Sequence, residues 1–139
     1  MVLTEGSRIR NPHYAKQLID FQGLGINGEV YPTDIDALIE YHDSEYILLE
    51  VKYKKTKVPY GQKLAIQRMI DDFTKVGKRA IALIAEHYHT NPKQPVIAAQ
   101  CRIREIYYGD DRTWERPEYE VTVRQAVDLF RSKNKEGHS

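Results

Sequence analysis

The feature that most constrains the fold is a pair of strand-like runs separated by a polar turn. Residues 33–41 (TDIDALIEY) and 46–54 (YILLEVKYK) are alternating or apolar, and HDSE lies between them. Two such runs joined by a short polar segment are typical of an antiparallel β-hairpin. The sequence therefore predicts a β-sheet, and the other elements must pack around this hairpin.

Helix and strand patterns flank the hairpin on both sides. They predict helices over 13–24, 62–76 and 122–133, a buried central strand over 79–88, a further strand over 96–109, and a loop or irregular edge over 109–120. The tail 133–139 has too little apolar content to order itself. With 139 residues, the chain is expected to form one α/β domain, a mixed sheet with helices packed on its faces.

Composition limits the classes of partner. The 21 basic and 20 acidic residues leave a formal net charge of +1, so a polyanion must be bound by a local patch. The single Cys101 cannot form an intramolecular disulfide, and no CxxC or HxxxH pair predicts a structural zinc site. Without a signal-like start or an apolar run near the ~20 residues of a membrane span, we expect a cytoplasmic protein that uses neither membrane nor small-molecule cofactor.

Acidic residues and a lysine share one face of the predicted hairpin. Side chains two apart in a strand point to the same face, so Glu50 and Lys52 project together. Asp34 and Asp36 are in phase on the partner strand, and the hairpin can bring one of them opposite Glu50. A solvent-facing ion pair gives the same ExK spacing. On an apolar strand, however, buried charges need a partner or a metal ion, and this set suits Mg²⁺ and phosphodiester hydrolysis.

A wider combination of motifs surrounds this set. The sequence has a PTDID strand start, a hairpin, an apolar strand into EVK, and a helix that opens with GQ. This combination covers roughly residues 29–86 and resembles the PD-(D/E)xK nuclease superfamily, in particular its small Holliday junction resolvases and phage-type nucleases. The resemblance implies metal-dependent hydrolysis of DNA. It also implies a restriction-endonuclease-like fold, a mixed β-sheet flanked by helices with an αβββαβ core.

The resemblance also assigns roles to residues. It makes Asp36 and Glu50 metal ligands together with the Val51 carbonyl, and it makes Lys52 the catalytic lysine. Asp34 competes with Asp36 for the first role. Asp36 is preferred because the apolar part of the strand follows it directly. The implied cofactor is Mg²⁺, for which Mn²⁺ is expected to substitute.

Two further positions of the family pattern are less well defined. Relatives place a glutamine near the active site on the helix after ExK, and Gln62 resembles it, with Gln67 as the alternative. Some relatives also carry a glutamate on the first helix, which here offers only Asp20. Glu5 takes that place as a metal ligand if the helix begins earlier, and Glu29 follows the helix.

A basic strip begins at the proposed site. Its members are Lys54, Lys55, Lys57, Tyr60, Lys63 and Arg68. Such a strip would hold phosphates, so nucleic-acid binding is expected to be salt-sensitive and to carry no sequence information. A solvated charged loop is the competing interpretation.

Several alternatives stay open at this point. The chain is interpreted either as an active nuclease, as a catalytically inactive nuclease-fold module for DNA binding or scaffolding, or as the nuclease subunit of a larger complex. The residues do not separate DNA from RNA, or endonuclease from exonuclease. A homodimer is expected because two sites related by a twofold axis can cut both strands of a symmetric substrate. Size and resemblance favour a phage or bacterial origin.

Overall fold

The computed structural model describes residues 21–30, 32–109 and 113–136, with side chains up to Lys133. The chain divides into two units, Met1–Pro32 and Thr33–Ser139, and the second holds all the helices and named strands of the described residues. The helix predicted over 13–24 lies outside the described residues up to Asp20. Its last part is wrong, because residues 21–24 form a turn in which Gly23 has a φ of 87°.

The predicted hairpin is confirmed. Strand β1 (Ala37–Tyr41) pairs antiparallel with β2 (Glu45–Tyr53). Between them His42 and Asp43 both have positive φ, 49° and 57°. Positive φ at consecutive turn residues is typical of tight hairpin turns, because it matches the twist of the two strands. The local turn chemistry therefore sets the register of the hairpin.

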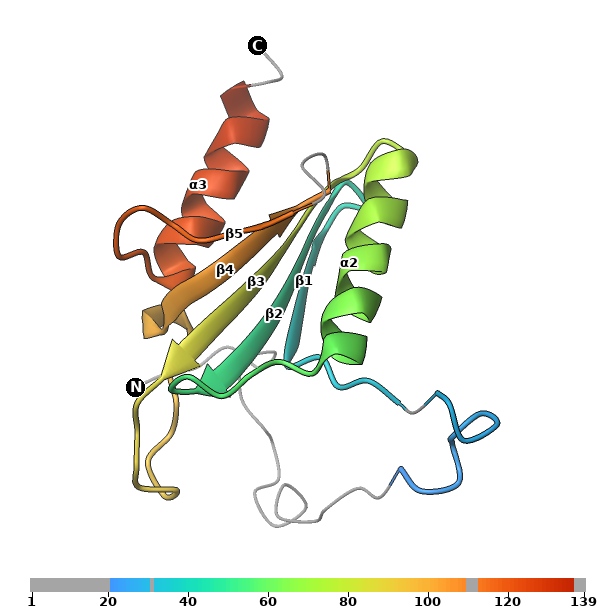
Figure 1. Ribbon diagram of the computed structural model, residues 1–139. Helices are drawn as coiled ribbons and strands as arrows, with labels where there is room; N and C mark the ends of the chain where they lie inside the picture. Colours follow the sequence, from blue (N-terminus) through green and yellow to red (C-terminus); the bar gives the residue numbers. More distant parts are fainter. Residues whose placement is uncertain (1–20, 31, 110–112, 137–139) are drawn as a thin grey trace. The chain divides into compact units, whose positions relative to one another are not determined.

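The sheet is mixed and five-stranded, with the order β1-β2-β3-β4-β5 (Figure 1). Strand β3 (Arg79–His87) runs parallel to β2, whereas β4 (Arg102–Tyr108) and β5 (Trp114–Glu115) continue the sheet antiparallel. Parallel neighbours need a crossover connection, and helix α2 (Tyr60–Lys75) supplies it between β2 and β3. The predicted α/β class with a mixed sheet is confirmed, as is the central position of the buried strand β3.

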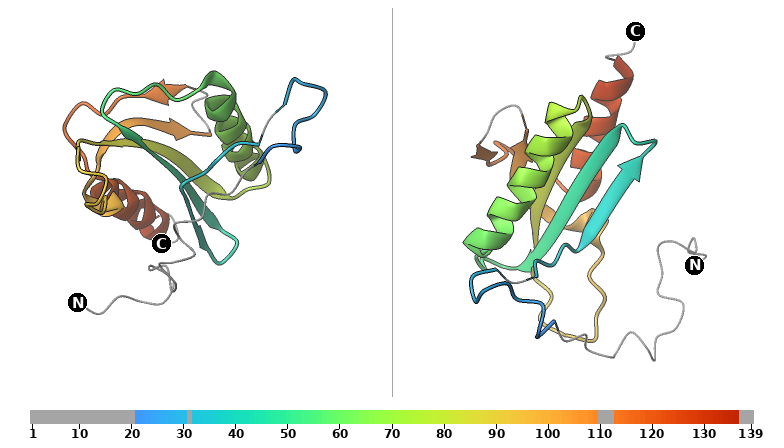
Figure 2. Two further views of the ribbon diagram at one scale, coloured as in Figure 1. Left: turned by 90° about the horizontal axis from the view of Figure 1, so that it is seen from below. Right: turned by 90° about the vertical axis from the view of Figure 1, so that its right-hand side faces the viewer.

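The two α-helices of the described residues cover opposite faces of the sheet (Figure 2). Ile47 and Leu49 of β2 belong to the core under α3 (Val123–Glu136). Leu48, which lies between them, packs with Ile70 of α2 in the other core. Side chains alternate along a strand, so the even-numbered residues of β2 face α2 and the odd-numbered ones face α3.

Some predicted boundaries differ from the structure. The strand predicted over 96–109 begins only at Arg102, because Ala98–Gln100 forms the short 3₁₀ helix η2. The segment 109–120 contains the two-residue edge strand β5, as expected. Helix α3 extends to Glu136 and thus into the predicted tail.

The αβββαβ pattern is met only in part by the described residues. Among residues 21–30 and 32–59, two strands precede α2 where the pattern requires three. Residues 21–30 form only an isolated bridge between Ile26 and Val30, because Gly23, Gly25 and Gly28 favour turns over a strand. None of the helices in the described part of the chain is long and apolar enough to cross a membrane.

Candidate functional site

Glu50 and Lys52 lie together near the end of β2. Both side chains face α2, and the Lys52 Nζ lies 3.2 Å from the Glu50 Oε1. The Glu50 side chain is 4% exposed, whereas that of Lys52 is 21% exposed. The pair therefore combines an enclosed carboxylate with an ammonium that a ligand can still reach. The structure thus has the Glu50 carboxylate and the Lys52 ammonium on one face of the strand, as their spacing predicts.

One oxygen of the Glu50 carboxylate is buried without a partner. Glu45, Glu50 and Glu86 are the buried acidic residues among those described. Glu45 places its two oxygens against Arg79 and Arg131, and Glu86 faces two guanidinium groups in the same way. Only the Glu50 Oε2 is a buried side-chain polar atom without a hydrogen-bond partner in the described part of the chain. A buried, unpartnered carboxylate oxygen is costly unless a cation or donor binds it.

Asp36 approaches the same end of β2 from the other strand. The paired register of β1 and β2 begins at Ala37 and Leu49, one residue after Asp36. The Asp36 Oδ2 accepts a hydrogen bond from the Val51 N–H at 2.7 Å. The N–H and C=O of a strand residue point to the same edge, so the Val51 carbonyl also points to the β1 edge of β2. The Asp36 and Glu50 carboxylates and the Val51 carbonyl thus all belong to residues at this end of the hairpin.

Asp34 and the two candidate glutamines have distinct positions. Gln62, in the first turn of α2, donates from its Nε2 to the backbone carbonyl of Asp34 at 2.7 Å. Gln62 therefore lies beside the segment that leads into β1. Gln67 instead accepts a hydrogen bond from the indole of Trp114 at 3.3 Å, on the β5 side of the helix. Of the two glutamines, Gln62 is the one that contacts the segment carrying Asp34 and Asp36.

The donor set is small in the part of the chain that the structure describes. No group of three or more His, Cys, Asp or Glu side chains lies close enough to hold a metal ion. Glu5 and Asp20 lie outside the described residues, and Glu29 belongs to the first unit. Mg²⁺ usually needs only one or two protein carboxylates, because waters and substrate phosphates complete its octahedron.

No family model, curated protein sequence or solved structure matches the chain.

The lysines that follow Lys52 form an exposed loop. Lys54, Lys55 and Lys57 lie between β2 and α2, and none of them forms an ion pair with another described residue. Lys54 has a φ of 47°, so the chain reverses immediately after β2. Tyr60, the first residue of α2, is also exposed. These four residues are thus exposed in the segment that directly follows Lys52 and Tyr53 of β2.

Arg104 of β4 holds this loop in place. Its Nη1 donates to the Thr56 carbonyl at 2.7 Å, and its Nη2 donates to the Lys54 carbonyl. The same guanidinium lies 3.5 Å from the buried carboxylate of Glu86. Sequence reasoning missed Arg104, because its partners lie 18 to 50 residues away along the chain and no local pattern connects them.

The other two members of the predicted basic strip lie elsewhere. The Lys63 Nζ contacts both oxygens of Glu105, at 3.1 and 3.0 Å, and lies over the Trp114 ring. Its charge is thus already neutralised. Arg68 is two residues, about 200° of helical turn, from each of the buried Ile66 and Ile70, so it points away from the sheet. The strip is therefore not continuous along α2.

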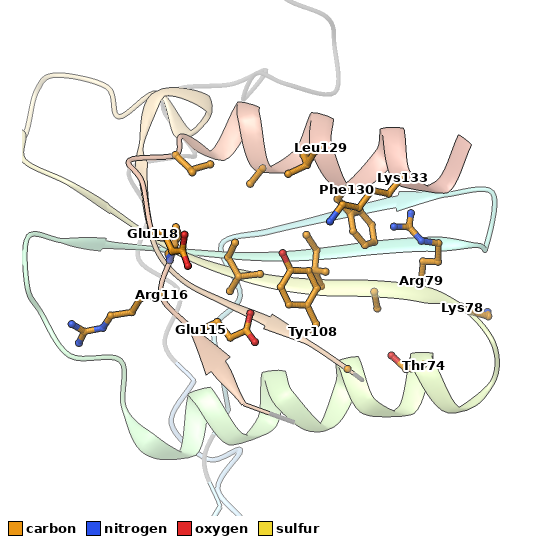
Figure 3. A pocket seen from close by; sticks show the side chains of 17 residues that line it. Thr74, Lys78, Arg79, Tyr108, Glu115, Arg116, Glu118, Leu129, Phe130 and Lys133 are labelled. Atoms are coloured by element: carbon orange, nitrogen blue, oxygen red, sulfur yellow. The ribbon is translucent and has the colours of Figure 1, made fainter. Parts of the chain in front are cut away.

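A separate cavity lies beneath α3 (Figure 3). It has a volume of about 880 Å³ and is lined by apolar side chains such as Ile81, Tyr108 and Phe130, with Lys133 among its cations. No described residue of the predicted site or basic strip lines it. Cys101 also belongs to this side of the sheet, and burial raises the pKa of its thiol, which makes it a weak nucleophile.

Proposed function

We propose that this chain is a metal-dependent nuclease that hydrolyses phosphodiester bonds of DNA, with a restriction-endonuclease-like fold of the PD-(D/E)xK type. The observation that carries the proposal is the buried, unpartnered Oε2 of Glu50 beside the partly exposed ammonium of Lys52. Glu45 and Glu86, the other buried glutamates among the described residues, are each paired with two arginines. The unpaired oxygen therefore supports the Glu50 carboxylate as the group that would bind a cation.

The residues at this position fit a hard divalent cation. Glu50 offers a free carboxylate oxygen, and Asp36 is exposed, with its second oxygen not engaged by Val51. The Val51 carbonyl points to the same edge of the strand. All three donors are oxygen atoms, which Mg²⁺ and Mn²⁺ prefer. We therefore infer that Asp36, Glu50 and the Val51 carbonyl would hold the ion.

The chain's own residues then divide the remaining tasks. When bound, the cation supplies Lewis-acid polarisation of a phosphoryl oxygen. The Lys52 ammonium has three donors, of which one faces Glu50. The others can orient an attacking water and stabilise the negative charge that develops on the phosphoryl oxygens. Gln62 holds the segment that carries Asp36 by binding the Asp34 carbonyl.

The test compares the same substitution at two ends of β2. Glu50→Gln and Lys52→Met are assayed on supercoiled plasmid, linear duplex, single strand and a four-way junction, with Mg²⁺, Mn²⁺ or chelator. Glu45→Gln is the matched control, because Glu45 is an equally buried glutamate on the same strand but is paired to two arginines. We expect Glu50→Gln and Lys52→Met to reduce cleavage by about 10²- to 10⁴-fold, and the folded Glu45→Gln to cleave like the wild type.

The outcomes separate the alternatives. Metal-dependent cleavage that survives in the folded Glu50→Gln and Lys52→Met variants would remove these residues from the proposed mechanism. Absence of cleavage on every substrate, with DNA still bound, would favour an inactive DNA-binding module or a subunit that needs its complex. RNA versions of the same substrates decide between the two nucleic acids. Light scattering during size-exclusion chromatography tests the proposed homodimer.

Cation binding has a readout besides activity. A ligand that binds only the folded state raises its stability, by about 2.7 kcal/mol at a concentration of 100 times Kd. Mg²⁺ or Mn²⁺ should therefore raise the Tm of the wild type and of Glu45→Gln, but not that of Glu50→Gln. An equal rise in all three proteins would place the cation elsewhere.

A further inference from the structure

A groove runs beside the candidate site on the side of β4. Its volume is about 860 Å³, and its walls are the loop Lys55–Val58, the start of β4 and the segment Arg116–Glu120. Glu86, which lines the groove, is the residue of β3 that pairs in register with Lys52 of β2. The groove therefore begins one strand away from the proposed catalytic lysine.

The groove presents an excess of unpaired positive charge. Two of its acids are already neutralised, the buried Glu86 by two arginines and the half-buried Glu105 by Lys63. Among the described residues that line it, Lys55, Lys57 and Arg116 form no ion pair, against a single such carboxylate, Glu118. Local positive charge of this kind attracts a phosphate backbone although the whole chain has a net charge of only +1.

The lysines of the groove are held in position rather than free to move with their loop. Arg104 binds the carbonyls of Lys54 and Thr56, the residues on either side of Lys55. It thereby fixes the backbone from which Lys55 and Lys57 project. A preorganised pair of cations loses less conformational freedom when it binds phosphates.

An exposed aromatic ring completes the groove. Tyr119 is 80% exposed and lines the groove within the segment Arg116–Glu120. Base stacking on exposed aromatic side chains, combined with a positively charged track, is how proteins bind single strands without sequence preference. In a duplex the bases are stacked on each other and their faces are hidden, so Tyr119 would have no base to receive.

The size of the groove also favours a single strand over a duplex. Its volume falls within the range of about 300–1,000 Å³ that encloses a drug-sized ligand, comparable to one or two nucleotides. A flexible single strand can bend into such a hollow. A duplex is stiff over about 150 bp, and its backbone cannot follow a hollow of this size.

We propose that this groove binds a single-stranded segment of nucleic acid, with its phosphates on Lys55, Lys57 and Arg116 and a base on Tyr119. This binding proposal rests on the proposed nuclease function in one respect only. If the chain is a nuclease, the groove holds the strand next to Lys52. The substrate class that follows is a nucleic acid with an unpaired segment, such as a flap, a gap or a single-stranded end.

The test measures binding without cleavage. Fluorescence anisotropy in chelator records the affinity for a labelled 15-mer oligo-dT, for the matching oligo-U, and for a blunt hairpin duplex with the same number of phosphates. The variants are Lys57→Gln/Arg116→Gln, Tyr119→Leu and Tyr119→Phe. Lys93→Gln/Lys133→Gln is the control, because it removes the same charge from exposed positions outside the groove.

We expect the single strands to bind at least tenfold more tightly than the duplex. Lys57→Gln/Arg116→Gln should weaken single-strand binding about tenfold and lower the slope of log K against log salt by about 1.4. Tyr119→Leu should weaken it by about 5- to 100-fold, whereas Tyr119→Phe keeps the ring and should bind like the wild type. Oligo-dT and oligo-U distinguish DNA from RNA as the source of the strand.

Three results would overturn the proposal: duplex bound as tightly as single strand, equal loss of binding in the Lys93→Gln/Lys133→Gln control, or full binding by Tyr119→Leu. The nuclease proposal is tested independently of the groove proposal. Glu50→Gln and Lys52→Met are scored by cleavage in the presence of metal, whereas the groove variants are scored by binding in chelator.

Discussion

Asp36 and Val51 are joined by a hydrogen bond of 2.7 Å between the aspartate Oδ2 and the backbone N–H. The contact links the residue before β1 to the end of β2. A backbone N–H that binds one carboxylate oxygen fixes the orientation of the other. Asp36 is therefore a structural partner of β2 as well as a proposed ligand of the cation.

Two substitutions of Asp36 separate these roles. Asp36→Asn keeps an oxygen that can accept from the Val51 N–H but loses the charge, whereas Asp36→Ala loses both. We expect Asp36→Asn to retain nearly the wild-type free energy of unfolding, and Asp36→Ala to lose about 1 kcal/mol. Both should lose cleavage at least 100-fold. Urea unfolding followed by circular dichroism and the plasmid assay measure the two effects. A fully active Asp36→Asn would show that the charge is not needed.

Replacement of Arg104 by lysine should destabilise the fold. Its planar guanidinium serves two carbonyls and the Glu86 carboxylate at once, which a single ammonium on a flexible stem cannot do. We expect Arg104→Lys to lower the free energy of unfolding by about 1–3 kcal/mol, because a backbone carbonyl and part of a buried carboxylate lose their donors. Trypsin should also cut faster after Lys54, Lys55 and Lys57.

The control for Arg104 is Arg124→Lys. Arg124 is exposed on α3 and pairs with Asp128 one helical turn away. Exposed pairs of this kind contribute about 0.3–0.5 kcal/mol, so neither stability nor the rate of trypsin cleavage in the lysine loop should change much. If both arginine variants behaved alike, Arg104 would have no special hold on the loop.

Gly109 leaves no room for a side chain. A Cβ at this position would lie 2.1 Å from the Thr74 Oγ1 and 2.9 Å from the Thr74 Cβ. We expect Gly109→Ala to lower the free energy of unfolding by about 1–3 kcal/mol, the usual penalty for overpacking. Thr74→Ala removes the closer atom, so the penalty should shrink in that background, which a double-mutant cycle measures. Gly61→Ala, where a Cβ would meet nothing within 4 Å, should not destabilise.

Asp43 should make stability depend on pH in the acid range. Hydrogen bonds from Lys78 and Tyr46 lower the pKa of Asp43 below its ordinary value of 3.8. A carboxylate whose pKa is lower in the folded state stabilises the fold above the unfolded-state pKa, and this contribution is lost as the pH falls through the lowered value. Urea unfolding of the wild type should therefore show a fall in stability below about pH 4 that is smaller in Asp43→Asn. Identical curves would contradict this role.

Much of the fold follows from short-range patterns in the sequence. The hairpin, α2 and β3 were each predictable from periodicity over about ten residues, because a strand or helix must turn its apolar side chains to one face. The helix predicted over 13–24 was wrong at its end, because Gly23 has a positive φ that interrupts a helix. The start of β4 was misplaced because apolar alternation does not distinguish a strand from the 3₁₀ turn at Ala98–Gln100.

The sequence alone determined that the acid and the lysine of the candidate site lie on one face of a strand. Glu50 and Lys52 are two residues apart on a strand, so they had to share a face in any fold that keeps β2 extended. The tertiary structure decided which groups they meet. The hydrogen bond from the Val51 N–H ties Asp36 rather than Asp34 to the end of β2, and the packing of α2 on β4 pairs Lys63 with Glu105. Such contacts depend on register and helix packing over tens of residues, which local periodicity does not encode.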